Sequence, residues 1–494
     1  MKIGFDNDKY LKMQSEHIKE RIAKFDNKLY LEFGGKLFDD YHASRVLPGF
    51  KPDSKLQMLL QLKDQAEVVI AISAEDIASN KIRGDYGITY DMEVLRLIDE
   101  FQNLGLSVNS VVITLYSGKE SSKKFRNQLE KRNIKTYVHT PTAGYPTDVD
   151  VIVSDKGYGA NPYIETTKKL VVVTAPGPSS GKLATCLSQL YHEYKRGVKA
   201  GYAKYETFPV WNLPLKHPVN VAYEAATADL KDVNMIDSFH LEKYGITSVN
   251  YNRDLEVFPV LKAILHKITG KDIYYSPTDM GVNMIGYAID DDKVICEASR
   301  QEIIRRYYKA LCDYKTGDSN EDVSKRIKLL MNELEINPLE ERPVIKIARE
   351  KSKAFDLPVI ALELPDGKII TGKKTEILSP ASSLILNAIK ELTNIPDEVD
   401  LLSKAVLEPI IKLKPLSNHS SRSLNLEEVL IALSICSVTN PIVKEALKNL
   451  NKLSGLEAHA SFMVYNGDLN TLKRLNINLT CDPVFYSNNL FMNE

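Results

Sequence analysis

The residues best suited to chemistry in this sequence form a glycine-rich stretch, APGPSSGK, at residues 175–182. Backbone N–H groups in such a loop wrap a phosphate group, and the dipole of a following helix and a lysine both favour an anion there. The candidate phosphate contacts are the loop residues that supply these groups: Gly177, Ser179, Ser180, Gly181 and Lys182. The stretch therefore predicts a site for a phosphorylated small molecule, with a nucleotide as the favoured class.

The loop departs from the GxxxxGK[ST] phosphate-binding motif at two positions. Pro176 stands where the first glycine is expected, and Leu183 stands where a serine or threonine would ligate Mg²⁺. The cofactor therefore stays undetermined, with a nucleotide favoured and Mg²⁺ dependence open. Thr174 and the two glycines also resemble the TGxxxG turn of short-chain dehydrogenases, which makes an NAD(P)-dependent oxidoreductase an alternative. The structural alternative is an ordinary turn between a strand and a helix.

A second stretch, from Gly367 to Lys374, matches the same motif. Its first glycine belongs to a Pro-Asp-Gly turn between two strand-like runs, and the next four residues are typical of a strand. We interpret this second match as a β-hairpin and not as a phosphate site.

Polar and aromatic residues crowd the irregular segments between residues 204 and 283, which is typical of an active-site wall. The catalytic hypothesis assigns proton transfer to one acid, Glu206 or Asp279, and the binding of substrate anions to Lys204 and Arg253. Each of these residues also has a structural interpretation. Asp279, for example, follows Ser-Pro-Thr and is suited to cap a helix.

The sequence predicts no metal site. Histidine and acidic residues gather after residue 216, but their spacing matches no known metal motif: His217, Asp229, Asp232, Asp237 and His240. His217 precedes a proline and is suited to cap a turn.

A smaller polar group follows the first strand-like run. Gly34, Gly35 and Lys36 come directly after it, at the position where ligand crevices open in parallel sheets, and Arg45 lies a little further on. Arg45 is the preferred anion contact in this region, and a surface arginine beyond a turn is the alternative.

Short apolar runs alternating with helix-length segments are expected to position these groups. The expected strands cover residues 29–33, 68–73, 111–116, 136–140, 150–154 and 170–175. Such alternation predicts an α/β fold with a doubly wound, mainly parallel sheet, Rossmann-like or P-loop-like. The runs are apolar almost throughout, which indicates helices on both faces of the sheet.

Three regions are expected along the chain. Residues 1–215 form the α/β domain with the glycine-rich loop, and residues 216–335 form a mainly helical region that completes the pocket, with one strand-like run at 282–289. A polar, proline-bearing segment precedes residues 336–494, which are predicted to form a smaller C-terminal α+β domain.

Composition excludes several classes of protein. The 494 residues carry a formal net charge of −1, which argues against a nucleic-acid partner or an anionic membrane partner. The five cysteines form no CxxC pair, and the N-terminus resembles no signal peptide, so the cytoplasm is the expected compartment. Whether the chain forms a homo-oligomer stays open.

Several long stretches resemble a bacterial family, of about this chain length, that is defined as a domain of unknown function. They are KLYLEFGGKLFDDYHASRVLPGF, VVVTAPGPSSGKLATCLSQLYHEYKRG, AKYETFPVWNLPLKHPVNVAYEAATADL, VNYNRDLEVFPVL and SPTDMGVNM. The resemblance covers the whole chain. It implies a loop reading APGPGSGK, so Ser179 replaces a glycine here, and a His-Ser-Thr sequence where this chain has His459-Ala460-Ser461. It implies no activity.

The sequence thus leaves three functional hypotheses. The first is an enzyme that binds a phosphorylated ligand or nucleotide at residues 177–182 and catalyses hydrolysis or phosphoryl transfer. The second is the NAD(P)-dependent oxidoreductase. The third is a non-catalytic anion-sensing or assembly protein, in which the loop only detects an anion.

Overall fold

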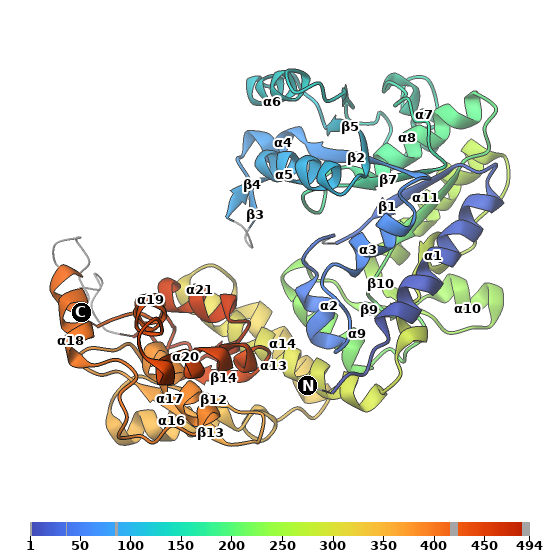
Figure 1. The fold of residues 1–494 in the computed structure, drawn as a ribbon. Coiled ribbons are helices and arrows are strands. Elements are labelled where there is room, and N and C mark those ends of the chain that lie inside the picture. Colours follow the sequence, from blue (N-terminus) through green and yellow to red (C-terminus); the bar gives the residue numbers. More distant parts are fainter. Residues whose placement is uncertain (1, 36, 84–86, 415–422, 487–494) are drawn as a thin grey trace. The chain divides into compact units, whose positions relative to one another are not determined.

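The computed structural model describes residues 2–35, 37–83, 87–414 and 423–486 (Figure 1). These residues fall into two compact units. Residues 2–224 and 231–299 form the first, here called the N-terminal unit, and residues 225–230 together with those from Arg300 onward form the C-terminal unit. The long helix α13 (Asp292–Thr316) runs through the residue at which the units divide, so no linker marks this boundary in the sequence.

The N-terminal unit is built on a seven-stranded sheet in which every pair of neighbouring strands is parallel. The strand order is β11-β8-β1-β7-β2-β5-β6. The strands are β1 (Leu29–Phe33), β2 (Ala66–Ser73), β5 (Ser107–Thr114), β6 (Thr136–Val138), β7 (Leu170–Thr174), β8 (Gly201–Tyr205) and β11 (Gly281–Val282). The predicted doubly wound α/β fold is confirmed.

Helices cover both faces of this sheet, as the apolar runs indicate. Every residue of β2 and β7 is buried. On one face, the Tyr30 hydroxyl of β1 donates a hydrogen bond to Glu193 of α8 at 2.7 Å. On the opposite face, the hydroxyl of Tyr205 at the end of β8 is hydrogen-bonded to that of Tyr10 in α1. Apolar burial on two faces is the main source of stability of such strands.

The remaining elements of this unit connect the strands. Its helices are α1 (Asn7–Lys24), α2 (Tyr41–Val46), α3 (Ser54–Gln61), α4 (Ala74–Ala78), α5 (Tyr90–Asn103), α6 (Glu120–Glu130), α7 (Val149–Ile152), α8 (Lys182–Lys195), α9 (Pro218–Ala226), α10 (Ser238–Tyr244), α11 (Asn252–Thr269) and α12 (Pro277–Met280). Two small antiparallel ribbons pair β3 (Ile82–Arg83) with β4 (Ile88–Thr89) and β9 (Asn234–Ile236) with β10 (Val249–Tyr251).

The strand order places a topological switch between β2 and β7. From β2 the chain continues to β5 and β6 on one side, and from β7 it continues to β8 and β11 on the other. In open parallel sheets, ligands bind in the crevice at the carboxyl ends of two such strands. The glycine-rich loop leaves the carboxyl end of β7, so the fold places it at this point.

Two strand predictions are wrong. Residues 150–154 lie in α7 and the turn after it, because the Asp148 carboxylate accepts a hydrogen bond from the Val151 N–H at 3.0 Å and caps a helical turn. Of residues 282–289, only Val282 is in a strand, and Ile285–Ala288 form a 3₁₀ helix. Short apolar runs are compatible with either state, so the local cap decides between them.

The C-terminal unit contains a mixed four-stranded sheet of order β13-β12-β14-β15. Its strands are β12 (Val359–Glu363), β13 (Ile369–Lys373), β14 (Glu457–Ala460) and β15 (Asn478–Cys481). Its helices after α13 are α14 (Glu321–Glu333), α15 (Pro338–Glu341), α16 (Val344–Phe355), α17 (Pro380–Thr393), α18 (Lys404–Leu413), α19 (Leu426–Cys436), α20 (Pro441–Lys448) and α21 (Asn466–Arg474). No helix in the described ranges is both long and apolar enough to span a membrane.

The hairpin predicted around Gly367 is confirmed. β12 and β13 pair antiparallel, and Gly367 occupies the turn between them with φ of +84°. The second match to the phosphate-loop motif therefore lies in a turn and an edge strand, as interpreted from the sequence.

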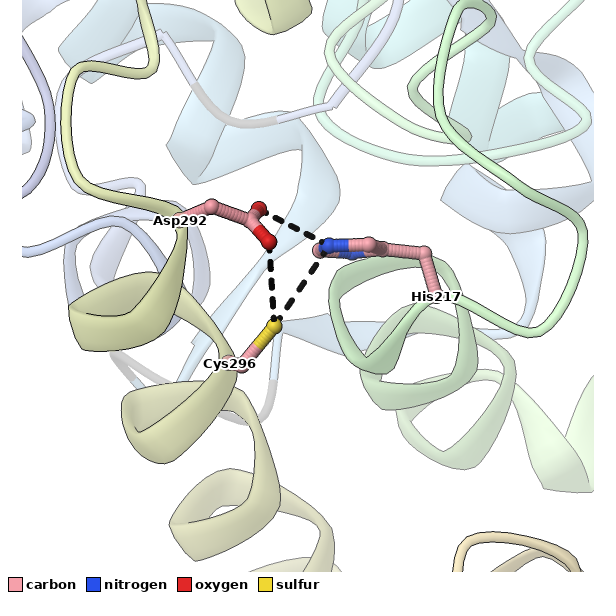
Figure 2. A group of neighbouring side chains, drawn as sticks. All are labelled: His217, Asp292 and Cys296. Carbon is pink, nitrogen blue, oxygen red and sulfur yellow. Dashed lines mark hydrogen bonds and ion pairs between the residues drawn. The ribbon is translucent and has the colours of Figure 1, made fainter.

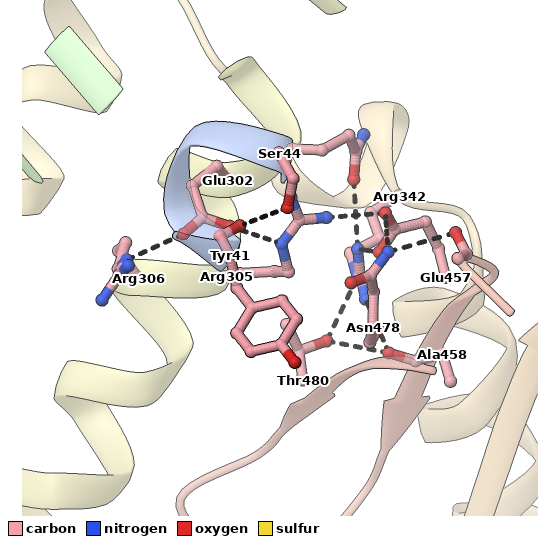
Figure 3. A network of polar contacts seen from close by, with 12 residues as sticks. Tyr41, Ser44, Glu302, Arg305, Arg306, Arg342, Glu457, Ala458, Asn478 and Thr480 are labelled. Atoms are coloured by element: carbon pink, nitrogen blue, oxygen red, sulfur yellow. Dashed lines mark hydrogen bonds and ion pairs between the residues drawn. The ribbon is translucent and has the colours of Figure 1, made fainter. Parts of the chain in front are cut away.

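A buried arginine organises the C-terminal unit (Figure 3). The side chain of Arg342 is 0% exposed and forms an ion pair with Glu457. Arg342 also donates hydrogen bonds to two neighbouring strands. In β14 the acceptor is the Ala458 carbonyl oxygen (2.7 Å), and in β15 the acceptors are the Asn478 carbonyl oxygen (2.6 Å) and the Thr480 hydroxyl (3.1 Å). A buried charge is tolerated only when it is paired and hydrogen-bonded in this way.

Replacing Arg342 by Leu should lower the free energy of unfolding of the C-terminal unit by about 3–5 kcal/mol, because the Ala458 and Asn478 carbonyl groups lose a charged donor and the partly buried Glu457 keeps only Arg305 as an arginine partner. Urea unfolding monitored by circular dichroism measures this change. The control is Arg474→Leu, which removes an exposed arginine paired with Glu427 at 3.1 Å and should cost less than about 1 kcal/mol. Equal losses in the two variants would contradict the assigned role of Arg342.

Candidate functional site

The glycine-rich loop is held in place by close packing against neighbouring elements. Gly181 adopts φ of +85°, and a β-carbon there would lie 2.8 Å from the Thr114 side chain at the end of β5. The Thr114 hydroxyl donates a hydrogen bond to the Ser180 carbonyl at 2.8 Å. A β-carbon at Gly177 would overlap the ring of Tyr90. Both glycines are therefore required by close approach, and Gly181 also by its backbone angle.

Ser179 adopts φ of +59°, the left-handed region that favours glycine. This chain therefore keeps the conformation that a glycine would favour, although a non-glycine residue adopts it at some cost.

The hydroxyl groups of Ser180 and of Thr185 in α8 point back into the protein. Ser180 is fully buried and donates to the Gly177 carbonyl at 3.0 Å, and Thr185 is fully buried and donates to the Gly181 carbonyl at 2.9 Å. Neither hydroxyl is turned outward to ligate Mg²⁺. The groups left to meet a ligand are the backbone N–H groups at the start of α8, the ammonium of Lys182 and the exposed side chain of Ser179.

The start of α8 has the features of an anion-binding helix terminus. Its N-cap is Gly181, and among the described residues no side chain caps it. The first N–H groups of a helix lack intrahelical acceptors and carry a partial positive charge. The Lys182 ammonium lies 3.5 Å from the Gly177 carbonyl, so it folds back over the loop. α8 is 14 residues long, which gives it a full macrodipole.

A charged cluster lies at the carboxyl end of β8, two strands away from β7. The Lys204 ammonium is 2.8 Å from Glu206 and 2.6 Å from Asp254, the latter in the first turn of α11. Glu32 of β1 is the cross-strand neighbour of Lys204, and the Trp211 indole N–H donates to Glu206 at 3.2 Å. The sequence placed Lys204 and Glu206 in one pocket, and the fold brings them into contact.

The cluster has more carboxylates than cations, and this affects the pKa of Glu206. Burial raises the pKa of Glu206, Lys204 lowers it, and the negative charge of Asp254 raises it again, with a net upward shift. Lys204 is flanked by both carboxylates, and its pKa is raised by them despite its burial. Two carboxylates competing for one ammonium cannot both be fully compensated. Glu206 is therefore suited to hold and release a proton.

The loop and the cluster lie on the same side of the sheet. Cys186, one turn into α8, is buried, and burial raises the pKa of its thiol, Glu32 raises it further and Lys182 lowers it. The Tyr202 hydroxyl donates a hydrogen bond to Glu32 at 2.7 Å, and Tyr202 is the cross-strand neighbour of Tyr30, which contacts Glu193 of α8. Because alternate residues of a strand point to the same face, Lys204 lies on the face of Tyr202. α8 and the carboxylate cluster therefore lie over the same face of the sheet.

The other candidate residues lie elsewhere. Arg253 is 58% exposed and forms an ion pair with Asp232 at 2.6 Å. The Asp279 carboxylate accepts hydrogen bonds from the Tyr244 hydroxyl and the Tyr275 N–H, both at 2.9 Å, which is a structural role in a turn. Arg45 lies in α2, and Lys36 lies outside the described residues.

His217 caps a helix, as its position before a proline suggested, and has two further neighbours (Figure 2). Its Nδ1 accepts a hydrogen bond from the Val219 N–H at the start of α9, at 3.3 Å. Its Nε2 lies 3.0 Å from Asp292 and 3.5 Å from Cys296, both in the first turns of α13. The acidic residues grouped with His217 in the sequence analysis do not gather around it: Asp232 pairs with Arg253, and Asp237 caps α10.

Sequence reasoning grouped Asp254 with Lys204 and Glu206 in the predicted wall but missed Glu32 and Cys296. A glutamate inside the apolar run LYLEF was a usable signal for Glu32, because an acid in a strand covered on both faces needs a partner. Cys296 gave no such signal, since it lies near the start of a long helix.

Gly181→Ala should destabilise the N-terminal unit more than Gly197→Ala. Both glycines have a positive φ, +85° and +81°, but a β-carbon at Gly197 meets nothing within 4 Å. The Gly197 variant should lose about 1 kcal/mol of unfolding free energy from backbone strain alone. The Gly181 variant should lose about 1–3 kcal/mol more, because its methyl group overlaps Thr114. Chemical denaturation compares them, and similar losses would contradict the packing described for the loop.

Glu206→Gln should change how stability depends on pH. Because the folded pKa of Glu206 is raised, the ionised form is disfavoured in the folded protein, so wild type should lose stability relative to the variant as pH rises from 4.5 through the raised value. Unfolding free energies measured between about pH 4 and pH 8 test this. Glu165→Gln, which removes a carboxylate that is 74% exposed, is the reference for the loss of one surface charge. A pH-independent difference for Glu206→Gln would show that its pKa is not raised.

Comparison with known proteins places this chain in a family. Two family models match, described as domain of unknown function DUF1846, N-terminal, over residues 3–335, and DUF1846, C-terminal, over residues 340–491. A UPF0371 protein of Clostridium botulinum (strain Alaska E43 / Type E3) is 57% identical over 504 residues, covering 100% of both chains.

Two further relatives are similar over their full lengths. A UPF0371 protein of Clostridium tetani (strain Massachusetts / E88) is 56% identical over 505 residues, covering 100% of both chains. A UPF0371 protein of Clostridioides difficile (strain 630) is 57% identical over 501 residues, covering 99% of this chain and 100% of the relative. The family resemblance stated from the sequence is confirmed, and the chain belongs to the bacterial DUF1846 family.

Proposed function

We propose that this protein is an enzyme that binds a phosphorylated ligand, with a nucleotide as the favoured class, at the start of α8. The reaction is hydrolysis or phosphoryl transfer, and Glu206 exchanges the proton. The observation that carries the proposal is that an uncapped helix terminus bearing Lys182 and a carboxylate cluster containing Glu206 share one edge of a parallel sheet.

Three features support phosphate binding at the loop. The N–H groups at the start of α8 present an anion site, and Lys182 provides a positive charge beside them. The loop also lies at the topological switch between β2 and β7, where open parallel sheets bind ligands. The close packing of Gly177 and Gly181 holds the backbone in a fixed shape, which lowers the entropic cost of binding.

The carboxylate cluster supports acid–base chemistry. A general acid or base works best when its pKa lies near the working pH. Burial, together with the negative charge of Asp254, raises the pKa of Glu206 toward that range. Lys204 and Trp211 hold its carboxylate at a fixed position. Such a fixed, partly desolvated acid is suited to transfer a proton to or from a bound substrate.

The spacing of the two parts sets the length of the ligand. One strand, β1, lies between β7 and β8, so the loop and the cluster are about 10 Å apart along the sheet edge. A ligand that reaches both must extend well beyond a phosphate group, as a nucleotide does. Inorganic phosphate should occupy only the loop.

Mg²⁺ is not required for this mode of binding. Ser180 and Thr185 use their hydroxyls inside the protein, and Leu183 has none. The phosphate is bound by backbone N–H groups and Lys182. We therefore expect affinity for the phosphorylated ligand to persist in the presence of EDTA.

Thermal-shift screening of wild type and Lys182→Ala tests the binding step. The ligands are ATP, GTP, AMP, NAD(H), NADP(H), sugar phosphates and inorganic phosphate, each with Mg²⁺ or with EDTA. A ligand that binds only the folded protein raises its apparent stability. At least one phosphorylated ligand should stabilise wild type, and Lys182→Ala should lose most of that shift because it lacks the ammonium beside the phosphate.

The matched control is Lys169→Ala. It removes an exposed lysine at the amino end of β7, the strand that the glycine-rich loop follows, and should leave the thermal shift unchanged. Glu206→Gln should still bind the ligand but should lose turnover, followed as product formation by mass spectrometry. An unchanged shift in Lys182→Ala would overturn the assignment of the loop. Equal turnover in Glu206→Gln and wild type would overturn the role of Glu206, and stabilisation by NAD(P)H alone would favour the oxidoreductase hypothesis.

A further inference from the structure

The group of His217, Asp292 and Cys296 brings together three side chains that bind transition metals (Figure 2). His217 comes from the turn before α9, and the other two residues come from successive turns of one face of α13. All three lie in the N-terminal unit. None of them belongs to the loop or to the Lys204 cluster, so this group is independent of the proposed function.

The contacts among these three side chains are close to the spacing of ligand atoms around one metal ion. His217 Nε2 is 3.0 Å from an Asp292 oxygen and 3.5 Å from Cys296 Sγ, and Cys296 Sγ is 3.7 Å from the other Asp292 oxygen. Zinc bonds of about 2.0–2.1 Å to nitrogen, about 2.0–2.2 Å to oxygen and about 2.3 Å to sulfur place tetrahedral ligand atoms about 3.3–3.6 Å apart. The nitrogen and the sulfur contact different Asp292 oxygens, so binding one ion requires the carboxylate to turn one oxygen toward both.

The chemistry of the ligands selects the metal. A thiolate and an imidazole favour zinc over Mg²⁺ or Ca²⁺, which prefer oxygen ligands. A thiolate and a carboxylate together carry two negative charges, which a divalent ion neutralises. We propose that His217, Asp292 and Cys296 bind one zinc ion and thereby fasten the start of α13 to the start of α9.

Zinc binding must redistribute protons in this group. The Cys296 thiol gives up its proton to solvent, and the proton on His217 Nε2 must leave so that this nitrogen can donate its lone pair to the ion. The neutral ring then carries its proton on Nδ1, and the contact from the Val219 N–H, which is long at 3.3 Å, is released. The helix cap and the metal bond are thus alternatives for His217.

The fourth coordination position should be open. Three protein ligands are present among the described residues, and the Asp292 side chain is 63% exposed. Zinc sites with three protein ligands hold a water molecule or a further ligand in the fourth position. The ion would therefore be exchangeable with chelators and accessible to a small ligand.

Equilibrium dialysis of the tag-free, full-length protein against zinc, followed by elemental analysis, tests this proposal. Wild type should retain one zinc ion per chain, and Cys296→Ser should lower the affinity by at least about 100-fold, since even residues that only support a zinc ligand are worth 10–100-fold. Cobalt provides a second readout: wild type should show a thiolate-to-cobalt absorption band, and Cys296→Ser should not.

Two controls separate metal binding from folding. Cys436→Ser removes a partly buried cysteine of α19 and should leave zinc and cobalt binding unchanged. His217→Asn keeps a side chain that caps helices but removes the imidazole, so it should fold as wild type does in circular dichroism and lose zinc. Failure of wild type to retain zinc, or full retention by Cys296→Ser or His217→Asn, would overturn the proposal. None of these measurements involves a phosphorylated ligand, so the phosphate proposal stands or falls separately.

Discussion

The parallel pairing of β7 with β1 and β2 is the constraint on which the rest of the N-terminal unit depends. β7 is buried along its whole length, so its backbone groups must be satisfied by both neighbouring strands. Because β7 lies in the middle of the sheet, the chain leaves it through a short loop directly over the sheet edge. On its other edge β1 pairs with β8, and that separate pairing brings Glu32 beside Lys204.

Positive and negative groups lie beside different strands at the carboxyl edge of this sheet. At β7 the loop offers a helix terminus and the Lys182 ammonium, and at β8 the carboxylates outnumber the one ammonium, that of Lys204. Under the proposed function, the Lys182 ammonium at the start of α8 and the carboxylates beside β8 would bind the two ends of a ligand in different ways. This asymmetry is why the proposed function assigns the phosphate to one end and proton transfer to the other.

The phosphate and zinc proposals rely on different parts of the chemistry of a protein. Phosphate binding at α8 would use backbone N–H groups, which any sequence with the right loop geometry can present. Zinc binding would use three side chains, which must be placed by two helices whose starts lie close together. A loop motif in the sequence can predict a phosphate site of this kind. A zinc site built from distant side chains becomes visible only when the packing of the helices is known.

The sequence by itself determined the class of the fold and the local shape of the loop. Nearly continuous apolar runs determine parallel strands, because only strands covered on both faces can bury so many apolar side chains, and the glycines determine where a tight turn can form. Residues 150–154 were mispredicted although the deciding signal is local, because the Asp148 cap begins a helical turn in an apolar run that is equally compatible with a strand. The meeting of Glu32 with Lys204, and of His217 with Cys296, was decided by the tertiary structure alone. The physical reason is that strand order and helix packing join residues far apart in the chain, while capping, turn and periodicity signals act only between near neighbours.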